Sequence, residues 1–315
     1  MTDALPLISV VIPCFNSELT LRETLESVLA QSWPTLEIIA VDDSSTDNTH
    51  AMLRGYAIRD KRVRVVRQAN AGCGAARNAG IRQARGQFIG LIDADDLWAP
   101  GYLAAHMQRF AADRALGVSF TRVRFIENDG LPTTETTRPK LKGIRPEDIL
   151  QDNPCGCAMM VARRKVFVDV GLFNDKLRRA EDQEWLFRVA LTAWKIEGID
   201  RVMADYRNSP AGLSADLEAQ FKAYLELLEH VRQIAPEVVG RFQRLAIAHM
   251  LHYMARRAIR LGQDRSVVRG FLMRALKAAP ELVLRKPRAT FGMLAVALVP
   301  GAAEVLVPAV RRVQT

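Results

Sequence analysis

The chain has 315 residues, of which 49% are hydrophobic and 25% are charged. This composition is typical of a globular protein with a sizeable core and excludes an intrinsically disordered chain. Its four cysteines, Cys14, Cys73, Cys155 and Cys157, lack zinc-type spacing and are too sparse for a secreted disulfide framework, so we expect reduced thiols in a cytoplasmic protein. The apolar run 5–11 has no basic segment before it, which favours a strand over a signal peptide.

The net charge of +9 is unevenly distributed. Residues 216–315 contain 16 Lys and Arg against 8 Asp and Glu, a net charge of +8, whereas residues 1–215 contain 28 against 27, a net charge of +1. This asymmetry predicts two parts with different roles, one domain over 1–215 and a basic region over 216–315.

The first hundred residues alternate strand-like and helix-like patterns. Apolar, partly β-branched runs predict strands, apolar residues at helical spacing predict a first helix, and Ser45 or Asp47 is a candidate cap for the second. Strands and helices that alternate at this spacing indicate βαβ units on a parallel sheet. The expected strands are 8–12, 36–41, 63–66 and 88–92, and the expected helices are about 21–29, 48–59 and 73–84.

Polar residues gather directly after three of these strands. In a parallel sheet the loops that follow the strands open on one edge, where α/β proteins bind ligands. The sequence therefore predicts a site at this edge. The residues are Pro13, Cys14, Phe15 and Asn16 after the first strand, Asp42 and Asp43 after the second, and Asp93, Asp95 and Asp96 after the fourth.

The three carboxylates of residues 93–96 repel one another at this spacing. A hard divalent cation on oxygen ligands would hold them together and would recruit a diphosphate on its other side. The alternative is an ordinary turn, since Asp is common in turns and Pro100 is suited to open a helix. These residues by themselves leave both interpretations open.

A dinucleotide-binding fingerprint is a weaker interpretation of Gly72-Cys73-Gly74. The segment follows a strand and opens a helix, but Arg77 stands at the position of the third glycine. It also follows the third strand, whereas the fingerprint belongs to the first βα turn. In the preferred interpretation the glycines permit a tight loop, and Arg77 is expected to point at an anionic or polar ligand.

Five segments, in order and at matching spacings, resemble family-2 glycosyltransferases over about residues 7–215. The resemblance implies the glycosyltransferase-A fold, a mostly parallel Rossmann-like sheet flanked by helices, here with a helical C-terminal extension. It also implies transfer of a sugar from a nucleotide-sugar with inversion at the anomeric carbon. The segments are VVIPCFN (10–16), AVDDSSTDNT (40–49), NAGCGAARNAGI (70–81), IGLIDADD (89–96) and AEDQEW (180–185).

The resemblance also implies roles for the donor side. The loop with Pro13, Phe15 and Asn16 is expected to hold the nucleoside together with Asp43, whose carboxylate would accept a base N–H. Asp42 is expected only to cap the following turn. By the same resemblance, Arg77 contacts base or phosphate, Asp93 contacts the ribose or a metal-bound water, and Asp95 or Asp96 binds a Mg²⁺ or Mn²⁺ ion that bridges the diphosphate.

Glu181 and Asp182 form a second centre. By the resemblance, Asp182 is the base that takes the proton of the acceptor hydroxyl, and Glu181 orients or binds the acceptor. The alternative is a pair of acids in the first turn of a helix, where the helix dipole favours them. The sequence departs from the family pattern at two points. The family often has a histidine two residues after the arginine of a Tyr-Arg pair, but Tyr206-Arg207 is followed by Asn208-Ser209. The Gln-x-x-Arg-Trp motif of processive synthases is also absent, which favours transfer of one sugar per encounter.

The C-terminal hundred residues show helical spacing, and basic residues 285–288 precede an apolar run over 291–299 that is too short to span a bilayer. This pattern is typical of an interfacial helix on anionic lipid, and equally of a helical cap packed on the domain. A nucleic-acid partner is not expected, because aromatic residues are not interleaved with the charges.

The sequence thus predicts a metal-dependent, inverting glycosyltransferase. It would move one sugar from a nucleotide-sugar, a UDP-sugar in the first place, to a glycan or lipid-linked acceptor for a cell-surface polysaccharide, in the cytoplasm or at the inner membrane face. Two alternatives stay open: a nucleotidyltransferase, against which the absence of a glycine- and lysine-rich triphosphate loop speaks, and a non-catalytic nucleotide-sugar-binding or scaffold protein.

Overall fold

The computed structural model describes residues 5–156, 159–208 and 216–298. Its strands are β1 (Ile8–Cys14), β2 (Leu36–Asp42), β3 (Val63–Arg67), β4 (Phe88–Leu91), β5 (Leu97–Trp98), β6 (Leu116–Ile126), β7 (Pro132–Thr136), β8 (Met160–Arg163) and β9 (Lys195–Arg207). Its helices are α1 (Leu21–Leu29), α2 (Thr49–Arg59), α3 (Cys73–Gln83), α4 (Tyr102–Ala112), α5 (Pro146–Gln151), α6 (Arg164–Val170), α7 (Glu181–Ala190), α8 (Leu217–Ile234), α9 (Pro236–Arg260), α10 (Arg265–Ala278), α11 (Leu282–Arg285) and α12 (Pro287–Leu298).

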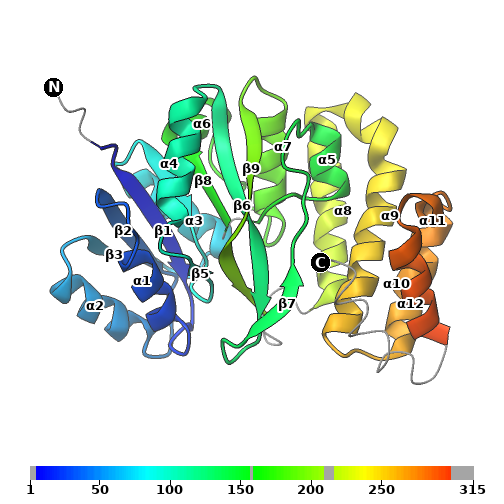
Figure 1. Ribbon diagram of the computed structural model, residues 1–315, viewed down its shortest axis with the longest axis horizontal. Helices are drawn as coiled ribbons and strands as arrows, with labels where there is room; N and C mark the ends of the chain where they lie inside the picture. Colours follow the sequence, from blue (N-terminus) through cyan, green and yellow to red (C-terminus); the bar gives the residue numbers. More distant parts are fainter. Residues whose placement is uncertain (1–4, 157–158, 209–215, 299–315) are drawn as a thin grey trace.

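These strands form one sheet in the order β3-β2-β1-β4-β8-β6-β9-β5, with β7 paired to β6 (Figure 1). The first four strands pair in parallel, which confirms the βαβ units predicted for residues 8–92. Beyond β4 the sheet is mixed, because β8 runs antiparallel to both β4 and β6, whereas β6 and β9 are parallel. The prediction of a parallel sheet is therefore correct for the N-terminal half of the sheet, from β3 to β4.

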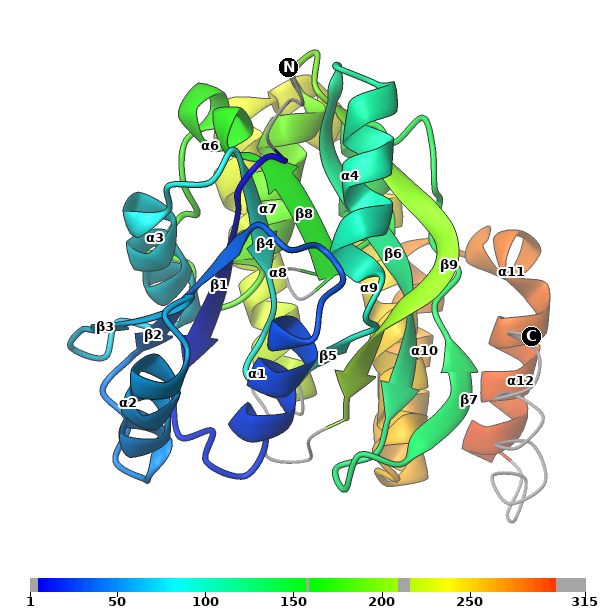
Figure 2. The same cartoon turned by 60° about the vertical axis from the view of Figure 1, so that its left-hand side comes forward.

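Helices cover both faces of the sheet, so the domain has three layers (Figures 1 and 2). Side chains alternate along β1: Ile8 and Ile12 are buried on the face of α1, α2 and α4, while Val11 is buried on the opposite face with residues of α3, α6 and α7. Burial on both faces explains why these strands are almost continuously apolar.

Gly80 lets α3 approach the sheet closely. A Cβ atom at this position would lie 2.4 Å from Val11 Cγ1 and 3.2 Å from Val41 Cγ2, so a larger residue would push the helix away from β1 and β2. Arg77 lies one turn earlier on the same helix, near its N-terminal end. The close packing therefore fixes an arginine at the carboxyl edge of the sheet.

The C-terminal region is helical, as predicted, and α8 packs on the domain. Tyr224 and Leu228 of α8 share a core with Trp185 of α7, and the Tyr224 hydroxyl donates to the Leu150 carbonyl at 2.5 Å. The second half of α9 forms a further small core with α10 and α12. The predicted boundary at residue 215 falls on 209–215, outside the described residues, and stays a prediction. Within the described ranges, no helix is both long and apolar enough to cross a bilayer.

Candidate functional site

The loops after β1, β2 and β4 meet at one edge of the sheet. Register places Cys14 beside Asp42 and Val11 beside Leu91, and the Thr20 hydroxyl donates to the Ala94 carbonyl at 2.9 Å. Strained backbone gathers here as well. The non-glycine residues with positive φ in the described ranges are Asn16 (47°), Ser44 (67°) and Ala180 (60°), and each lies in a segment that the sequence assigns to the site.

Asp43 is held by the loop that leads into α3. Its Oδ1 accepts hydrogen bonds from Gln68 Nε2 at 2.8 Å and the Ala71 N–H at 2.9 Å, and its Oδ2 accepts from the Gly72 N–H at 2.9 Å. A carboxylate has about four acceptor positions, which leaves one on Oδ2 for a ligand N–H. The contact of Asp43 with a base stays a prediction. It would require only the remaining acceptor position on Oδ2.

The loop after β1 lies beside Asp43. Pro13 is buried, the Phe15 side chain is 50% exposed, and Asn16 Oδ1 accepts the Thr46 N–H at 2.8 Å. Asp42 accepts the Ser45 N–H at 3.0 Å, so it caps the following turn as expected. An exposed aromatic ring on a loop fixed by hydrogen bonds is available to pack on a planar ligand.

Asp95 and Asp96 form an acidic pair that is poorly compensated. Asp96 is 2% exposed; its Oδ1 accepts the Arg207 N–H at 2.9 Å, and its buried Oδ2 has no hydrogen-bond partner among the described residues. Burial and the charge of Asp93 raise the pKa of Asp95 to about 6, and burial and the charge of Asp95 raise the pKa of Asp96 well above its usual range. In both groups, burial and the repulsion between the carboxylates outweigh the opposing charge of Arg207.

This donor set fits a Mg²⁺ or Mn²⁺ ion, since it consists of carboxylate oxygens with unused lone pairs. In the described part of the chain no three His, Cys, Asp or Glu side chains already surround a common point. Three protein ligands are not required, because Mg²⁺ typically binds one or two carboxylates and completes its shell with water and substrate phosphates.

Arg77 joins the donor side to the second centre. Its side chain is buried, with Nη2 at 2.6 Å from Asp93 Oδ1 and Nη1 at 2.5 Å from Glu181 Oε1. Glu181 is itself 7% exposed, and 104 residues separate it from Arg77 in the sequence. The guanidinium therefore holds Glu181 in place, and the predicted role of Glu181 in orienting or binding the acceptor stays a prediction. The predicted contact of Arg77 with base or phosphate stays a prediction.

Asp182 lies in the first turn of α7, directly after Glu181 and close to the strained Ala180. Its Oδ1 accepts the Gln183 N–H at 2.7 Å, and a Cβ atom on Gly156 would lie 3.5 Å from its Oδ2. Burial and the charge of Glu181 raise the pKa of Asp182 to about 6, against the opposing effect of Arg77. A carboxylate with this pKa can accept a proton near neutral pH, as a general base must.

The alternative interpretation of two acids in a first helical turn stays open, because Glu181 and Asp182 both lie in the first turn of α7 together with Glu184. Glu184 pairs with Arg188 one turn later at 2.7 Å and is fully buried. Gly156 of the loop 153–156 lies against Asp182, whereas Cys157, the next residue of this loop, lies outside the described residues.

Arg207 and Gln68 are site residues to which the sequence analysis gave no role. Arg207 is 3% exposed and holds the acidic loop, since its Nε donates to the Asp95 carbonyl at 2.9 Å and its Nη2 contacts Glu23 Oε2 at 2.6 Å. The available signal was the Tyr206-Arg207 pair, which the family resemblance marks near the end of the domain. No sequence pattern marked Gln68, because its hydrogen bond to Asp43 depends on the path of the loop between β3 and α3.

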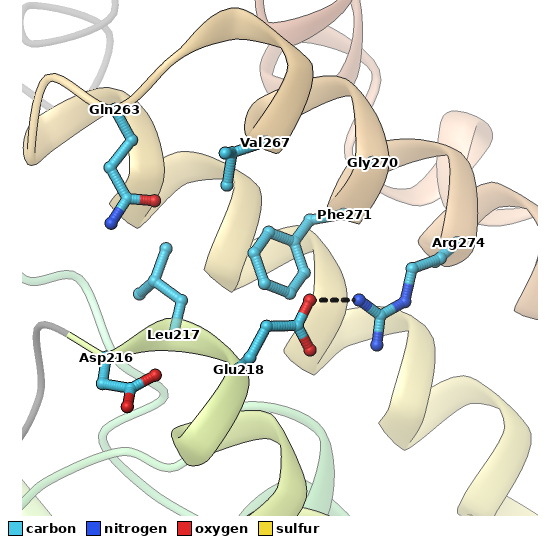
Figure 3. A pocket seen from close by; sticks show the side chains of 8 residues that line it. All are labelled: Asp216, Leu217, Glu218, Gln263, Val267, Gly270, Phe271 and Arg274. Carbon is cyan, nitrogen blue, oxygen red and sulfur yellow. Dashed lines mark hydrogen bonds and ion pairs between the residues drawn. The ribbon is translucent and has the colours of Figure 1, made fainter.

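A separate pocket of about 350 Å³ lies between the start of α8 and α10, away from these residues (Figure 3). Glu218 and Arg274 face each other across it at 2.6 Å, and Arg274 also stacks on Phe221 and Phe271. Its lining consists of Asp216, Leu217, Glu218, Gln263, Val267, Gly270, Phe271 and Arg274.

Known proteins resemble the chain in sequence. A family model described as "Glycosyl transferase family 2" matches residues 9–171. The glycosyltransferase TuaG of Bacillus subtilis (strain 168), whose name places it in teichuronic acid biosynthesis, is 31% identical over 210 residues, covering 66% of this chain and 81% of that protein. The uncharacterized glycosyltransferase EpsJ of the same organism is 28% identical over 248 residues, covering 72% and 71%.

Solved structures resemble it in fold. The structure of S. aureus TarS 1–349 in complex with UDP-GlcNAc superposes with a TM-score of 0.62 at 19% identity, covering 98% of this chain and 90% of that one. The mannosyltransferase PcManGT from Pyrobaculum calidifontis, in complex with GDP-Man and Mn²⁺, gives a TM-score of 0.60 at 20% identity, covering 96% and 87%. These likenesses show the predicted glycosyltransferase-A fold.

Proposed function

Because this chain belongs to glycosyl transferase family 2 and is a glycosyltransferase, we propose that it moves one sugar from a nucleotide-sugar to a saccharide or lipid-linked saccharide acceptor, with inversion at the anomeric carbon. The donor proposed first is a UDP-sugar, supported by the similar structure that holds UDP-GlcNAc. The likeness to TuaG supports a role in cell-surface polysaccharide synthesis.

One observation carries the proposal: Arg77 ties the donor edge to the catalytic carboxylates through Asp93 and Glu181. Inverting transfer needs a leaving group on one side of the anomeric carbon and a base on the other. The two centres come from segments about ninety residues apart, and a single buried guanidinium holds them together. This arrangement suits a displacement between two bound substrates.

On the donor side, Asp43 would accept an N–H of the base, and Asp93 would contact the ribose or a metal-bound water. Asp95 and Asp96 would hold a Mg²⁺ or Mn²⁺ ion through carboxylate oxygens that no donor of the described residues occupies, since the Arg207 N–H engages only Oδ1 of Asp96. When bound, such an ion supplies Lewis-acid stabilisation of the departing nucleoside diphosphate.

On the acceptor side, the Asp182 carboxylate would take the proton of the attacking hydroxyl. The hydroxyl oxygen forms the new bond to the anomeric carbon as the bond to the diphosphate oxygen breaks and its electron pair leaves with the nucleotide. The negative charge of Asp182 also favours an oxocarbenium-like transition state.

The reaction is tested by incubating the protein with nucleotide-sugars and an acceptor pool and measuring nucleoside diphosphate release. We expect kcat/KM to fall about tenfold per pH unit below pH 6, because protonation of Asp182, whose pKa is about 6, removes the base. Release of pyrophosphate from a nucleoside triphosphate would indicate a nucleotidyltransferase instead. An acid limb near pH 4 would contradict the role given to a buried Asp182.

We also propose that α11 and α12 contact an anionic membrane surface. One side of α12 is buried on the helices beneath it, whereas Phe291 (59%) and, in α11, Leu284 (84%) are exposed. Arg285 and Arg288 lie among them, exposed and without an ion pair in the described ranges. Exposed apolar side chains flanked by cations match the chemistry of an anionic lipid interface.

Flotation with vesicles tests this contact. The protein should float with phosphatidylglycerol vesicles and not with phosphatidylcholine vesicles. The double variants Leu284→Ser/Phe291→Ser and Arg285→Gln/Arg288→Gln should each bind less, since each basic residue near the surface contributes about 1 kcal/mol. Ile58→Ser, an exposed apolar position on α2 (83%), is the matched control. Equal flotation of all variants would exclude this surface.

A further inference from the structure

The loop between α6 and α7, residues 171–180, is fixed on α3 at both of its ends. Near its start, the buried Asn78 side chain of α3 accepts the Phe173 N–H at 3.0 Å and donates to the Phe173 carbonyl at 2.9 Å. Directly after its end, Glu181 lies against the first turn of α3, since a Cβ atom at Gly74 would lie 3.2 Å from Glu181 Cγ. The loop is therefore held over the N-terminal turn of α3.

Arg178 of this loop reaches over Gly72, the residue that precedes α3. A Cβ atom at Gly72 would lie 3.2 Å from Arg178 Nη1 and 3.8 Å from its Cδ. A larger residue here would push the arginine aside, besides being strained at the φ of 92° that Gly72 adopts. The Arg178 side chain is exposed, and no hydrogen bond or ion pair joins its guanidinium to another described residue. Its N–H donors are therefore available to a ligand at this point.

Gly72 also brings Arg178 close to the carboxylate that is proposed to bind the base. Its N–H donates to Asp43 Oδ2 at 2.9 Å, while its Cα side faces the guanidinium. Gln68 and the Ala71 N–H occupy both acceptor positions of Oδ1, so Asp43 offers a ligand one position, on Oδ2. The site therefore presents one acceptor from Asp43 and, beside it, the N–H donors of a guanidinium.

Uracil, the base of the donor proposed first, needs both groups. Its N3–H lies between two ring carbonyls, so an acceptor that takes this N–H has a carbonyl oxygen close beside it. A carboxylate alone would repel that oxygen, whereas a guanidinium next to the carboxylate donates to it and offsets the repulsion. Guanine presents two adjacent N–H donors on the matching edge, and the single position on Asp43 Oδ2 would leave one of them without an acceptor.

We propose that Arg178 is a further donor-binding residue, which hydrogen-bonds a carbonyl oxygen of the nucleobase beside the N–H that Asp43 accepts. The inference rests on the proposed function in one respect, that a uracil base lies at Asp43. It deepens that function, because Arg178 belongs to the segment that leads into Glu181 and Asp182. The base would then be read from both sides of the site, by the donor edge of the sheet and by the loop that carries the second centre.

Calorimetric titration of the full chain, with Mn²⁺ saturating, tests this contact. We expect Arg178→Gln to weaken the binding of UDP and of uridine by the same factor, about tenfold or more, because each loses one hydrogen bond from a charged donor. Methyl diphosphate, which has no base, should bind the variant and the wild type alike. Arg178→Lys should recover part of the affinity for UDP, since it keeps a cationic donor.

Lys176→Gln, which removes an exposed cation of the same loop, is the matched control and should bind UDP like the wild type. Thermal unfolding should give the same Tm for Arg178→Gln and the wild type, because the side chain is exposed and has no partner among the described residues. Asp43→Asn tests the premise and should weaken the binding of UDP and of uridine as well.

Equal UDP affinity of Arg178→Gln and the wild type would overturn the inference, and the proposed function would stand if Asp43→Asn still weakens binding. A loss shared by UDP and methyl diphosphate but absent with uridine would make Arg178 a phosphate contact and would also overturn it. UDP binding that Asp43→Asn leaves unchanged, or no binding of any nucleotide, would refute the donor site itself and the inference with it.

Discussion

Asp182→Asn should reduce sugar transfer about a thousandfold while leaving nucleotide affinity unchanged, because a positioned general base contributes typically 10²–10⁴-fold. Asparagine has the shape of aspartate and keeps the hydrogen bond from the Gln183 N–H, but it cannot take the hydroxyl proton. Initial rates and calorimetric nucleotide titration on the same preparation measure the two effects separately.

The same substitution should stabilise the fold at neutral pH. The folded-state pKa of Asp182, about 6, lies above the unfolded value of 3.8, so the folded chain binds more protons between these pH values and loses stability as pH rises through them. Removing the charge should raise Tm by about 2 °C at pH 7.5, with the gain shrinking towards pH 4. Asp175→Asn, an exposed acid in the preceding loop, is the control for both readouts. If the Asp182→Asn variant still turns over at about a tenth of the wild-type rate, Asp182 is not the base.

Arg77→Met should cause the largest loss of stability, about 3 kcal/mol or more, because it leaves Glu181 and Asp93 without their shared cation. Chemical denaturation and thermal unfolding measure this loss. Transfer should fall as well, since Glu181 loses the group that orients it beside Asp182.

The control for Arg77 is Arg82→Met, an exposed arginine on the same helix, which should change stability by less than about 0.5 kcal/mol. The double variant Arg77→Met/Glu181→Gln should be more stable than Arg77→Met alone, because it removes one of the uncompensated charges. Purely additive effects in this cycle would mean that the contact at 2.5 Å contributes no coupling.

The sequence predicted the N-terminal half of the fold well because its signals there are local. Each βα unit carries its own apolar run and helical spacing, so the strands at 8–14 and 36–42 and helix 73–83 fall where expected. The mixed half of the sheet was not predictable in this way. The pairing of β8 with β4 and β6 joins residues about seventy and forty positions apart, and neither strand carries a local sign of its partner.

The candidate site shows the same division. Asp43 and Asp95 were visible as carboxylates at strand ends, whereas Asp182 was assigned only through the family resemblance, and the roles of all three stay predictions. Their partners depend on the tertiary structure. The contact from Arg77 to Glu181 spans 104 residues and that from Arg207 to Asp96 spans 111, and no spacing rule relates such distant positions.

Calorimetric titration with UDP, GDP, dTDP and CMP, each with Mn²⁺ and with a chelator, tests the central claim most directly. We expect one nucleotide, UDP first, to bind tightly with Mn²⁺ and weakly with the chelator. Asp95→Asn should lose the metal-dependent part, and the exposed Asp129→Asn should bind like the wild type. Binding of no nucleotide under any condition, or equal binding by the Asp95→Asn and wild-type proteins, would contradict a metal-dependent donor site at this edge of the sheet.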